Sequence, residues 1–232
     1  MDYAERLQAI LSRIDAACAR SARAPGSVTL IAVSKTFPIA DVAAAHAAGQ
    51  VHFGENKIQE LVSKSEELPG KAQGGAVTWH MIGHPQRNKI KYIAPFIDLI
   101  HGVDSFRLAE EINKRAAQHG RVQDVLVQVN VSGEESKAGL DPAGLPALLD
   151  EVAPLEHVRV CGLMTLASPT EEESILRREF ALMRSLRDAA CAQHPSVVHL
   201  SMGMSGDFEG AIEEGATMVR VGSAIFGRRA YP

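Results

Sequence analysis

The sequence predicts an α/β protein, a single (β/α)8 barrel of the TIM type over residues 1–232 with an extra N-terminal helix. Two observations predict this fold: eight apolar runs of strand type follow one another along the chain, and helical patterns separate them. Strands that alternate with helices pair in parallel, and eight such units in one domain favour a closed barrel. With 232 residues, 46% of them hydrophobic, the chain can bury the core of such a domain.

The first predicted strand, VTLIAVS at 28–34, is apolar throughout, which is typical of a strand that is covered on both faces in a parallel sheet. The other seven predicted strands are 51–53 (VHF), 78–83 (TWHMIG), 99–103 (LIHGV), 124–131 (DVLVQVNV), 158–166 (VRVCGLMTL), 197–202 (VVHLSM) and 218–222 (MVRVG).

Helical patterns fill the seven intervals, at 39–48, 55–67, 86–93, 105–119, 141–152, 170–193 and 207–214. The extra helix is the amphipathic opening MDYAERLQAILSRIDAACARS, and a short helix is expected around 224–229. The charged side chains of GENKIQELVSK (54–64) are expected to face solvent on an exposed helix.

An open doubly wound sheet is the competing α/β architecture. Such a sheet binds its ligand with a glycine-rich turn after the first strand. Here that turn is SKTFP (34–38), which contains no glycine, and Gly203 and Gly206 in SMGMSG do not complete a GxGxxG motif. The sequence therefore favours the closed barrel.

Composition excludes several classes of partner. The net charge of −4 gives no general attraction to nucleic acid, and no run of 18 apolar residues could span a membrane. The three cysteines are widely spaced without a CxxC motif, and the N-terminus has no basic segment leading into an apolar one, so a cytoplasmic protein is expected. A monomer is expected because the barrel leaves no apolar stripe uncovered.

The carboxyl ends of barrel strands carry the functional residues of this fold. The last predicted strand carries Arg220, and Gly222 and Ser223 follow just before a helix, where free amide N–H groups and a hydroxyl suit a phosphate. Ser201, at the end of the seventh strand, can add a second hydroxyl. Lys35 follows the first strand, which lies beside the eighth once the barrel closes. An amine beside a phosphate cradle predicts a ligand with a carbonyl and a phosphate, such as pyridoxal 5′-phosphate (PLP).

Lys35 can form a Schiff base with the aldehyde of PLP, since a partly apolar surrounding disfavours its ammonium form. Arg220 would then donate a hydrogen bond to the pyridine nitrogen and keep that nitrogen unprotonated. A ring in that state is a poor electron sink, which argues against transamination and decarboxylation. Asn56 can donate a hydrogen bond to the oxygen side of the ring.

Several segments resemble the pyridoxal phosphate homeostasis proteins (the YggS/PROSC type): IAVSKT (31–36), FGENKIQE (53–60), WHMIGHPQRNK (79–89), LSMGMSGDFEGAI (200–212) and RVGSAIFG (220–227). The resemblance implies a barrel similar to the N-terminal domain of alanine racemase, with PLP on Lys35. It also implies phosphate and ring contacts at Asn56, Ser201, Arg220, Gly222 and Ser223. Members look like carriers or regulators of intracellular PLP and of amino- and keto-acid balance, without established catalytic turnover; PLP-dependent apo-enzymes are the partners that a carrier would supply.

The chain departs from the family pattern at two positions. Phe37 stands where many members carry a second lysine, and Pro85 stands where leucine is usual. Lys137, in SGEESKAGL, matches a family loop lysine that holds or passes on cofactor; a solvated loop charge is the alternative interpretation.

A PLP-dependent amino acid racemase is the alternative function. Two-base racemisation needs a proton donor on each face of the substrate. In alanine racemase the second group is a tyrosine from a β-rich domain, which we do not expect here, since the chain stops at Pro232. The tyrosines of this chain are Tyr3, Tyr92 and Tyr231, none of them expected at the site.

A zinc site is a third hypothesis, because His80 and His84 are four residues apart. They flank Gly83 at a predicted strand end, and no glutamate follows His80, so the helical geometry of a zinc pair is absent. Histidines that are satisfied by hydrogen bonds or that face solvent are the better interpretation.

Overall fold

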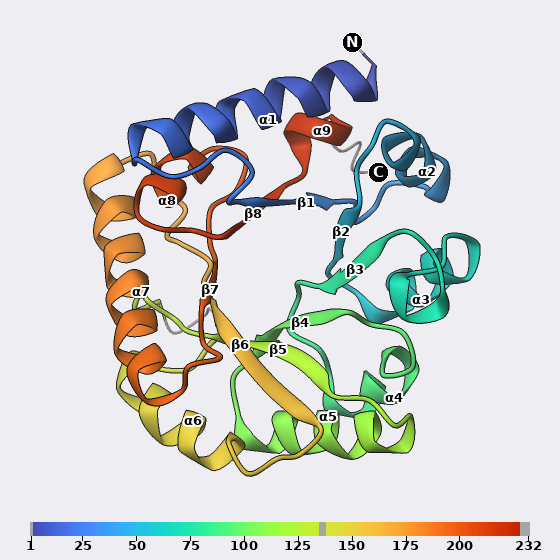
Figure 1. Ribbon diagram of the computed structural model, residues 1–232, viewed down its shortest axis with the longest axis vertical. Helices are drawn as coiled ribbons and strands as arrows, with labels where there is room; N and C mark the ends of the chain where they lie inside the picture. Colours follow the sequence, from blue (N-terminus) through green and yellow to red (C-terminus); the bar gives the residue numbers. More distant parts are fainter. Residues whose placement is uncertain (1, 135–137, 228–232) are drawn as a thin grey trace.

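The computed structural model describes residues 2–134 and 138–227, and its strands form a closed barrel (Figure 1). Each strand pairs in parallel with the next, and the last returns to the first. The predicted fold class is therefore confirmed. The strands are β1 (Thr29–Val33), β2 (His52–Glu55), β3 (Thr78–Met81), β4 (Leu99–Val103), β5 (Gln123–Gln128), β6 (Val158–Met164), β7 (His199–Ser201) and β8 (Met218–Val221).

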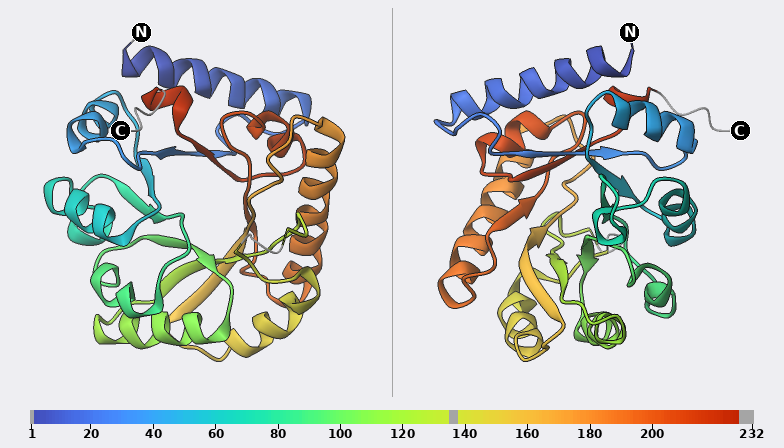
Figure 2. Two further views of the ribbon diagram at one scale, coloured as in Figure 1. Left: turned by 180° about the vertical axis from the view of Figure 1, so that it is seen from behind. Right: turned by 45° about the vertical axis from the view of Figure 1, so that its right-hand side comes forward.

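Helices surround the barrel as an outer ring (Figures 1 and 2). The α-helices are α1 (Tyr3–Arg20), α2 (Ile39–Ala47), α3 (Ile58–Glu67), α4 (Ile90–Ile93), α5 (Phe106–Gln118), α6 (Leu145–Val152), α7 (Glu173–Gln193), α8 (Phe208–Glu213) and α9 (Ser223–Phe226). Three 3-10 turns complete the ring: η1 (Lys71–Gln73), η2 (Arg87–Lys89) and η3 (Pro142–Gly144). Every predicted helix has a counterpart, and boundaries differ by a few residues.

The boundary difference that matters for the site lies at β2, which runs to Glu55 where the prediction ended the strand at residue 53. Helix α3 accordingly begins at Ile58 rather than at residue 55. Because Glu55 belongs to a strand, its side chain is fully buried instead of exposed on a helix. The shift places the Glu55 carboxyl next to Ser34 and Lys64, behind the loop that carries Lys35.

The core has two parts, as expected of a barrel. The larger part lies between the outer face of the strands and the helices, and it includes the fully buried Trp79 and Phe53, whose rings contact each other. The smaller part fills the barrel interior with five apolar side chains: Ile31, Leu99, Leu126, Met164 and Met218.

The extra helix α1 lies across α8 and α9, beside the junction of β8 and β1 (Figure 2). Its buried residues are Leu7, Ile10, Ile14, Ala17 and Cys18, whose spacing places them on one face. A capping box between Asp2 and Glu5 starts the helix. The helix therefore covers the seam at which the barrel closes. Within residues 2–134 and 138–227, no helix has the length and apolar character needed to cross a membrane.

Candidate functional site

A cavity of about 960 Å³ lies at the carboxyl ends of the strands. Five of the six predicted site residues line it: Lys35, Asn56, Arg220, Gly222 and Ser223. They come from β1, β2 and β8, which neighbour one another in the closed barrel. The other residues of the lining are Val33, Ile82, Gly83, His84, Gln128, Ala138, Leu166, Ala167, Pro169, Met204, Ser205 and Gly206.

The pairing of β1 with β8 brings the predicted amine and the predicted phosphate cradle together. Ala32 of β1 pairs with Val221 of β8. Lys35 lies three residues after Ala32, and Gly222 and Ser223 lie one and two residues after Val221. All three therefore leave neighbouring strands at the same end of the barrel. Barrel closure is the physical reason, because these residues are separated by more than 180 positions in the sequence.

The backbone around Lys35 is held on both sides. Ser34 is fully buried, and its hydroxyl donates to Glu55 Oε1 at 2.6 Å. Thr36 has a φ of 70°, a strained conformation for a β-branched residue, and its N–H donates to Glu60 Oε1 at 2.6 Å. Strain of this kind persists only where surrounding contacts enforce it, so the loop presents Lys35 from a fixed backbone.

A buried ion pair stands behind this loop. Lys64 Nζ donates to Glu55 Oε1 at 2.7 Å, to Glu60 Oε1 at 2.8 Å and to the Ser34 carbonyl oxygen at 2.8 Å. Burial raises the pKa of the Glu55 carboxyl, and the nearby Lys64 ammonium opposes that rise. The expectation that the charges of residues 54–64 are solvated is therefore wrong for Glu55 and Lys64, because β2 and α3 turn both side chains inward.

The end of the cavity that is predicted to hold the phosphate is formed by backbone and hydroxyl groups. Ser223 begins α9, so its N–H and that of Ala224 have no partner inside the helix. The Gly222 N–H points to Ser205 Oγ at 3.4 Å, and Ser205 lines the cavity. Neither Ser205 nor Gly206 was among the predicted site residues, although both lie in the same SMGMSG segment as Ser201.

Ser201 is fully buried and does not line the cavity. Its side chain faces the barrel interior, where Arg220 Nη1 donates to its oxygen at 2.6 Å. Because residues alternate in direction along a strand, Ser201 at the end of β7 points inward, and the loop beyond it supplies Ser205 to the cavity. Ser201 thus supports Arg220 from below, which differs from the direct contact expected from the sequence.

Arg220 forms the buried floor of the cavity. Only 4% of the residue is exposed, and its second donor, Nη2, bonds the Thr165 carbonyl oxygen at 2.8 Å. Burial lowers the pKa of the guanidinium to about 10, so the group remains a cation at neutral pH. Its side-chain hydrogen-bond partners within the described part of the chain are neutral, and the residue lines the cavity.

The two histidines of the zinc hypothesis belong to different environments. His80 is buried in the barrel interior and bonds His52 and His101, at 3.0 Å each. His84 lies at the cavity rim and faces Asp104, with Nδ1 at 3.3 Å from Oδ2. Among residues 2–134 and 138–227, no three His, Cys, Asp or Glu side chains are arranged so that they could hold a metal ion.

The two family departures and the described tyrosines, Tyr3 and Tyr92, are not among the residues that line the cavity. Phe37 stacks on Phe226, with ring centroids 5.1 Å apart. Tyr3 packs against the same Phe226 at 5.8 Å, and Tyr92 is 54% exposed. Pro85 lies two residues before the turn η2. Lys137 and Tyr231 lie outside the described residues.

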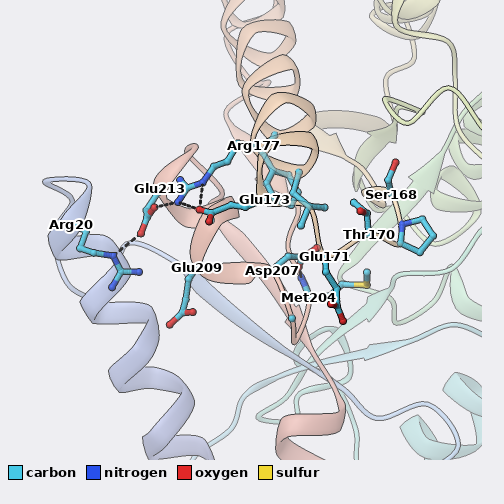
Figure 3. A pocket seen from close by; sticks show the side chains of 15 residues that line it. Arg20, Ser168, Thr170, Glu171, Glu173, Arg177, Met204, Asp207, Glu209 and Glu213 are labelled. Carbon is cyan, nitrogen blue, oxygen red and sulfur yellow. Dashed lines mark hydrogen bonds and ion pairs between the residues drawn. The ribbon is translucent and has the colours of Figure 1, made fainter.

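A second cavity, of about 830 Å³, adjoins the first and shares Pro169, Met204 and Gly206 with it (Figure 3). Its charged side chains mainly bond one another: Glu213 accepts from Arg20 and Arg177, and Arg177 also bonds Glu173. These two arginines lower the pKa of the Glu213 carboxyl. The network ties α1, α7 and α8 together, and we assign it to stability.

The donor set fits the predicted cofactor. An amine, an anion cradle of N–H and hydroxyl groups, and a buried cation surround a space with apolar walls from Val33, Ile82 and Leu166. Gly222 leaves room for this arrangement, because a Cβ there would lie 3.2 Å from the Val33 carbonyl oxygen.

Gly222→Ala is expected to weaken PLP binding roughly tenfold, about 1.4 kcal/mol. The added methyl would press on Val33 and shift the N–H groups of the predicted phosphate cradle. Equilibrium titration of the purified variant with PLP measures the effect. Gly210→Ala, in helix α8 with only an ordinary contact to Arg177 at 3.5 Å, is the control. Equal affinity of the two variants would contradict the assigned cradle.

Comparisons with known proteins agree with this geometry. The family model described as "Alanine racemase, N-terminal domain" matches residues 6–230. The chain is 43% identical to the pyridoxal phosphate homeostasis protein of Aquifex aeolicus, over all of both chains. It is 40% identical to that of Escherichia coli K12, over 99% of this chain and 98% of that protein.

Solved structures of similar fold include a member of the same family and an alanine racemase. The chain is similar to Synechococcus elongatus PipY with PLP bound, at a TM-score of 0.83 and 38% identity over 97% of this chain and 100% of that one. It also resembles an alanine racemase of Clostridium difficile, at a TM-score of 0.72 over 98% of this chain and 57% of that one. Sequence identity to the racemase is 15%, so that likeness concerns the fold alone.

Proposed function

Because this chain belongs to the pyridoxal phosphate homeostasis proteins, we propose that it binds PLP covalently through Lys35 and takes part in PLP homeostasis. The observation that carries the proposal is the convergence of Lys35, Asn56, Arg220, Gly222 and Ser223 on one cavity. PLP binding is also supported by the similarity to PipY, a relative whose structure was solved with PLP bound.

Each residue has a role that follows from its chemistry. Lys35 supplies the amine that adds to the aldehyde carbon, with loss of water. The N–H groups of Gly222 and Ser223 and the hydroxyls of Ser205 and Ser223 hold the phosphate. Arg220 donates to the pyridine nitrogen, and Asn56 donates to the ring oxygen. PLP supplies an electron-withdrawing ring, and Arg220 limits that capacity because the guanidinium gives no proton to the nitrogen.

The test is titration of the purified chain with PLP, followed by hydride reduction and mass spectrometry of the protein. The expected result is a visible absorbance band that saturates at one PLP per chain, and a stable mass increase located on the peptide that contains Lys35. A chain that stays colourless and gains no mass would overturn the proposal.

A carrier fits the site better than a racemase does. Tyr3 and Tyr92, the described tyrosines, are both outside the lining of the cavity, so neither offers a second proton donor there. We propose a cytoplasmic, monomeric carrier in one barrel domain, which passes PLP to PLP-dependent apo-enzymes. Incubation of the PLP-loaded protein with L- and D-alanine, followed by chiral analysis, separates the two functions: turnover at ordinary enzyme rates would support the racemase.

A further inference from the structure

A buried chain of hydrogen bonds runs through the barrel interior and ends on Arg220. His52 Nδ1 lies 3.0 Å from His80 Nε2, and His80 Nδ1 lies 3.0 Å from His101 Nε2. His101 Nδ1 then lies 3.0 Å from Ser201 Oγ, which accepts from Arg220 Nη1 at 2.6 Å. The chain therefore connects the start of β2 with the floor of the cofactor cavity.

The two inner histidines are neutral. His80 is 2% exposed and His101 is fully buried. Burial lowers the pKa of His80 to about 3, and it lowers the pKa of His101 well below its ordinary value, with further contributions from His80 and Arg220. Each ring therefore carries one proton at neutral pH, so it has one nitrogen that donates and one that accepts.

Arg220 sets the direction of the chain. A guanidinium can only donate, so Ser201 Oγ accepts from it and directs its own hydrogen to His101 Nδ1. His101 must then carry its proton on Nε2 and donate to His80 Nδ1, and His80 donates from Nε2 to His52. If His101 instead donated from Nδ1 to Ser201 Oγ, the buried Ser201 hydroxyl hydrogen would have no acceptor among residues 2–134 and 138–227. An unsatisfied buried donor of this kind costs free energy of folding.

We propose that His101, supported by His80, is a positioning residue for Arg220. By accepting the Ser201 hydrogen, His101 keeps the Ser201 oxygen turned toward Nη1, and this contact together with the Thr165 carbonyl orients the guanidinium. The remaining N–H groups of Arg220 then face the cavity and the pyridine nitrogen. This inference rests on the proposed function, because it concerns the ring of bound PLP.

The first test uses the wild-type protein without PLP. Nuclear magnetic resonance of protein labelled with ¹⁵N-histidine reports which ring nitrogen carries the proton. We expect His80 and His101 to be protonated at Nε2 and unprotonated at Nδ1 at neutral pH. A proton on Nδ1 of His101, or a doubly protonated ring, would overturn the inference.

The second test compares His101→Leu with His101→Asn. Leucine removes the acceptor for Ser201, whereas asparagine places Oδ1 as many bonds from its Cα as histidine places Nδ1. We expect His101→Leu to weaken PLP binding about tenfold, the size of one hydrogen bond to a charged group. With PLP labelled at the pyridine nitrogen, His101→Leu should also shift that ¹⁵N signal toward the protonated form, and His101→Asn should restore the wild-type signal.

His199→Leu is the matched control. His199 is also in the barrel wall, two residues from Ser201, but it bonds Thr217 Oγ1 at 3.3 Å and is not part of the chain. Its replacement should leave the ¹⁵N signal of the cofactor unchanged. Identical signals from His101→Leu and the wild type, or equal changes in His101→Leu and His101→Asn, would overturn the inference.

The two proposals can fail separately. A wild-type protein that does not bind PLP would remove the proposed function, while the histidine protonation measurement would still decide the direction of the chain. A wild type that binds PLP with Nδ1 of His101 protonated would remove only the positioning role. If His101→Leu does not fold, the protonation of the wild-type histidines and the signal of His101→Asn decide the outcome.

Discussion

Lys35→Ala is expected to abolish covalent attachment of PLP. Lys35 supplies the one amine that the described residues bring into the cavity lining, so removal of its Nζ leaves the aldehyde without a nucleophile there. The phosphate and ring contacts remain, so reversible binding should persist with reduced affinity. Two quantities are measured: the visible absorbance band that saturates at one PLP per chain, and the increase in protein mass after hydride reduction. Both should fall to background in the variant.

Lys57→Ala provides the control, because Lys57 is an exposed lysine that precedes helix α3 near the site. It should retain the absorbance band and the mass increase in full. Circular dichroism should show that both variants keep the fold. Retention of a stoichiometric, hydride-stable mass increase in Lys35→Ala would show that another residue carries PLP.

Lys64→Met is expected to have the largest effect on stability. The Lys64 side chain is 6% exposed and pairs with the fully buried carboxylate of Glu55, whose Oε2 already has no partner among the described residues. Removal of one partner leaves the other as an uncompensated buried charge, which costs about 3–5 kcal/mol. Urea denaturation of the purified variant should show this loss in the free energy of unfolding.

Two further variants make this prediction specific. Lys57→Met changes an exposed lysine at the start of the same helix and should alter the free energy of unfolding little. The double variant Glu55→Gln/Lys64→Met removes the buried charge as well and should recover part of the lost stability. Equal stability of Lys64→Met and Lys57→Met would contradict the buried pair.

The fold could be predicted because it depends on a local pattern. The alternation of apolar strands with amphipathic helices is visible within short windows, and parallel pairing follows from it. Lys35, Gly222 and Ser223 could be selected for the same reason, since they lie where predicted strands end and a general rule places barrel sites there. The family resemblance at 31–36 and 220–227 supported the same residues.

The roles of Ser201, Ser205, Glu55 and Lys64 could not be predicted in this way. Strand β2 ends two residues later than predicted, so Glu55 is buried in a strand, whereas the prediction placed its charge on an exposed helix. Likewise, the last position of β7 points Ser201 inward and leaves Ser205 to line the cavity. Sequence windows locate strand ends to within a few residues, whereas the direction of a side chain changes with every residue.

The order of residues along the chain was enough to predict the barrel, the end that carries the cavity and the lysine in the cavity lining, because each of these follows from periodicity and from where strands stop. The histidine chain beneath Arg220 and the ion pair behind Lys35 became visible only in three dimensions. The histidine chain joins side chains from β2, β3, β4, β7 and β8, so it depends on barrel closure and register, which no local pattern records. The ion pair joins β2 to α3 and depends on the exact residue at which the strand ends.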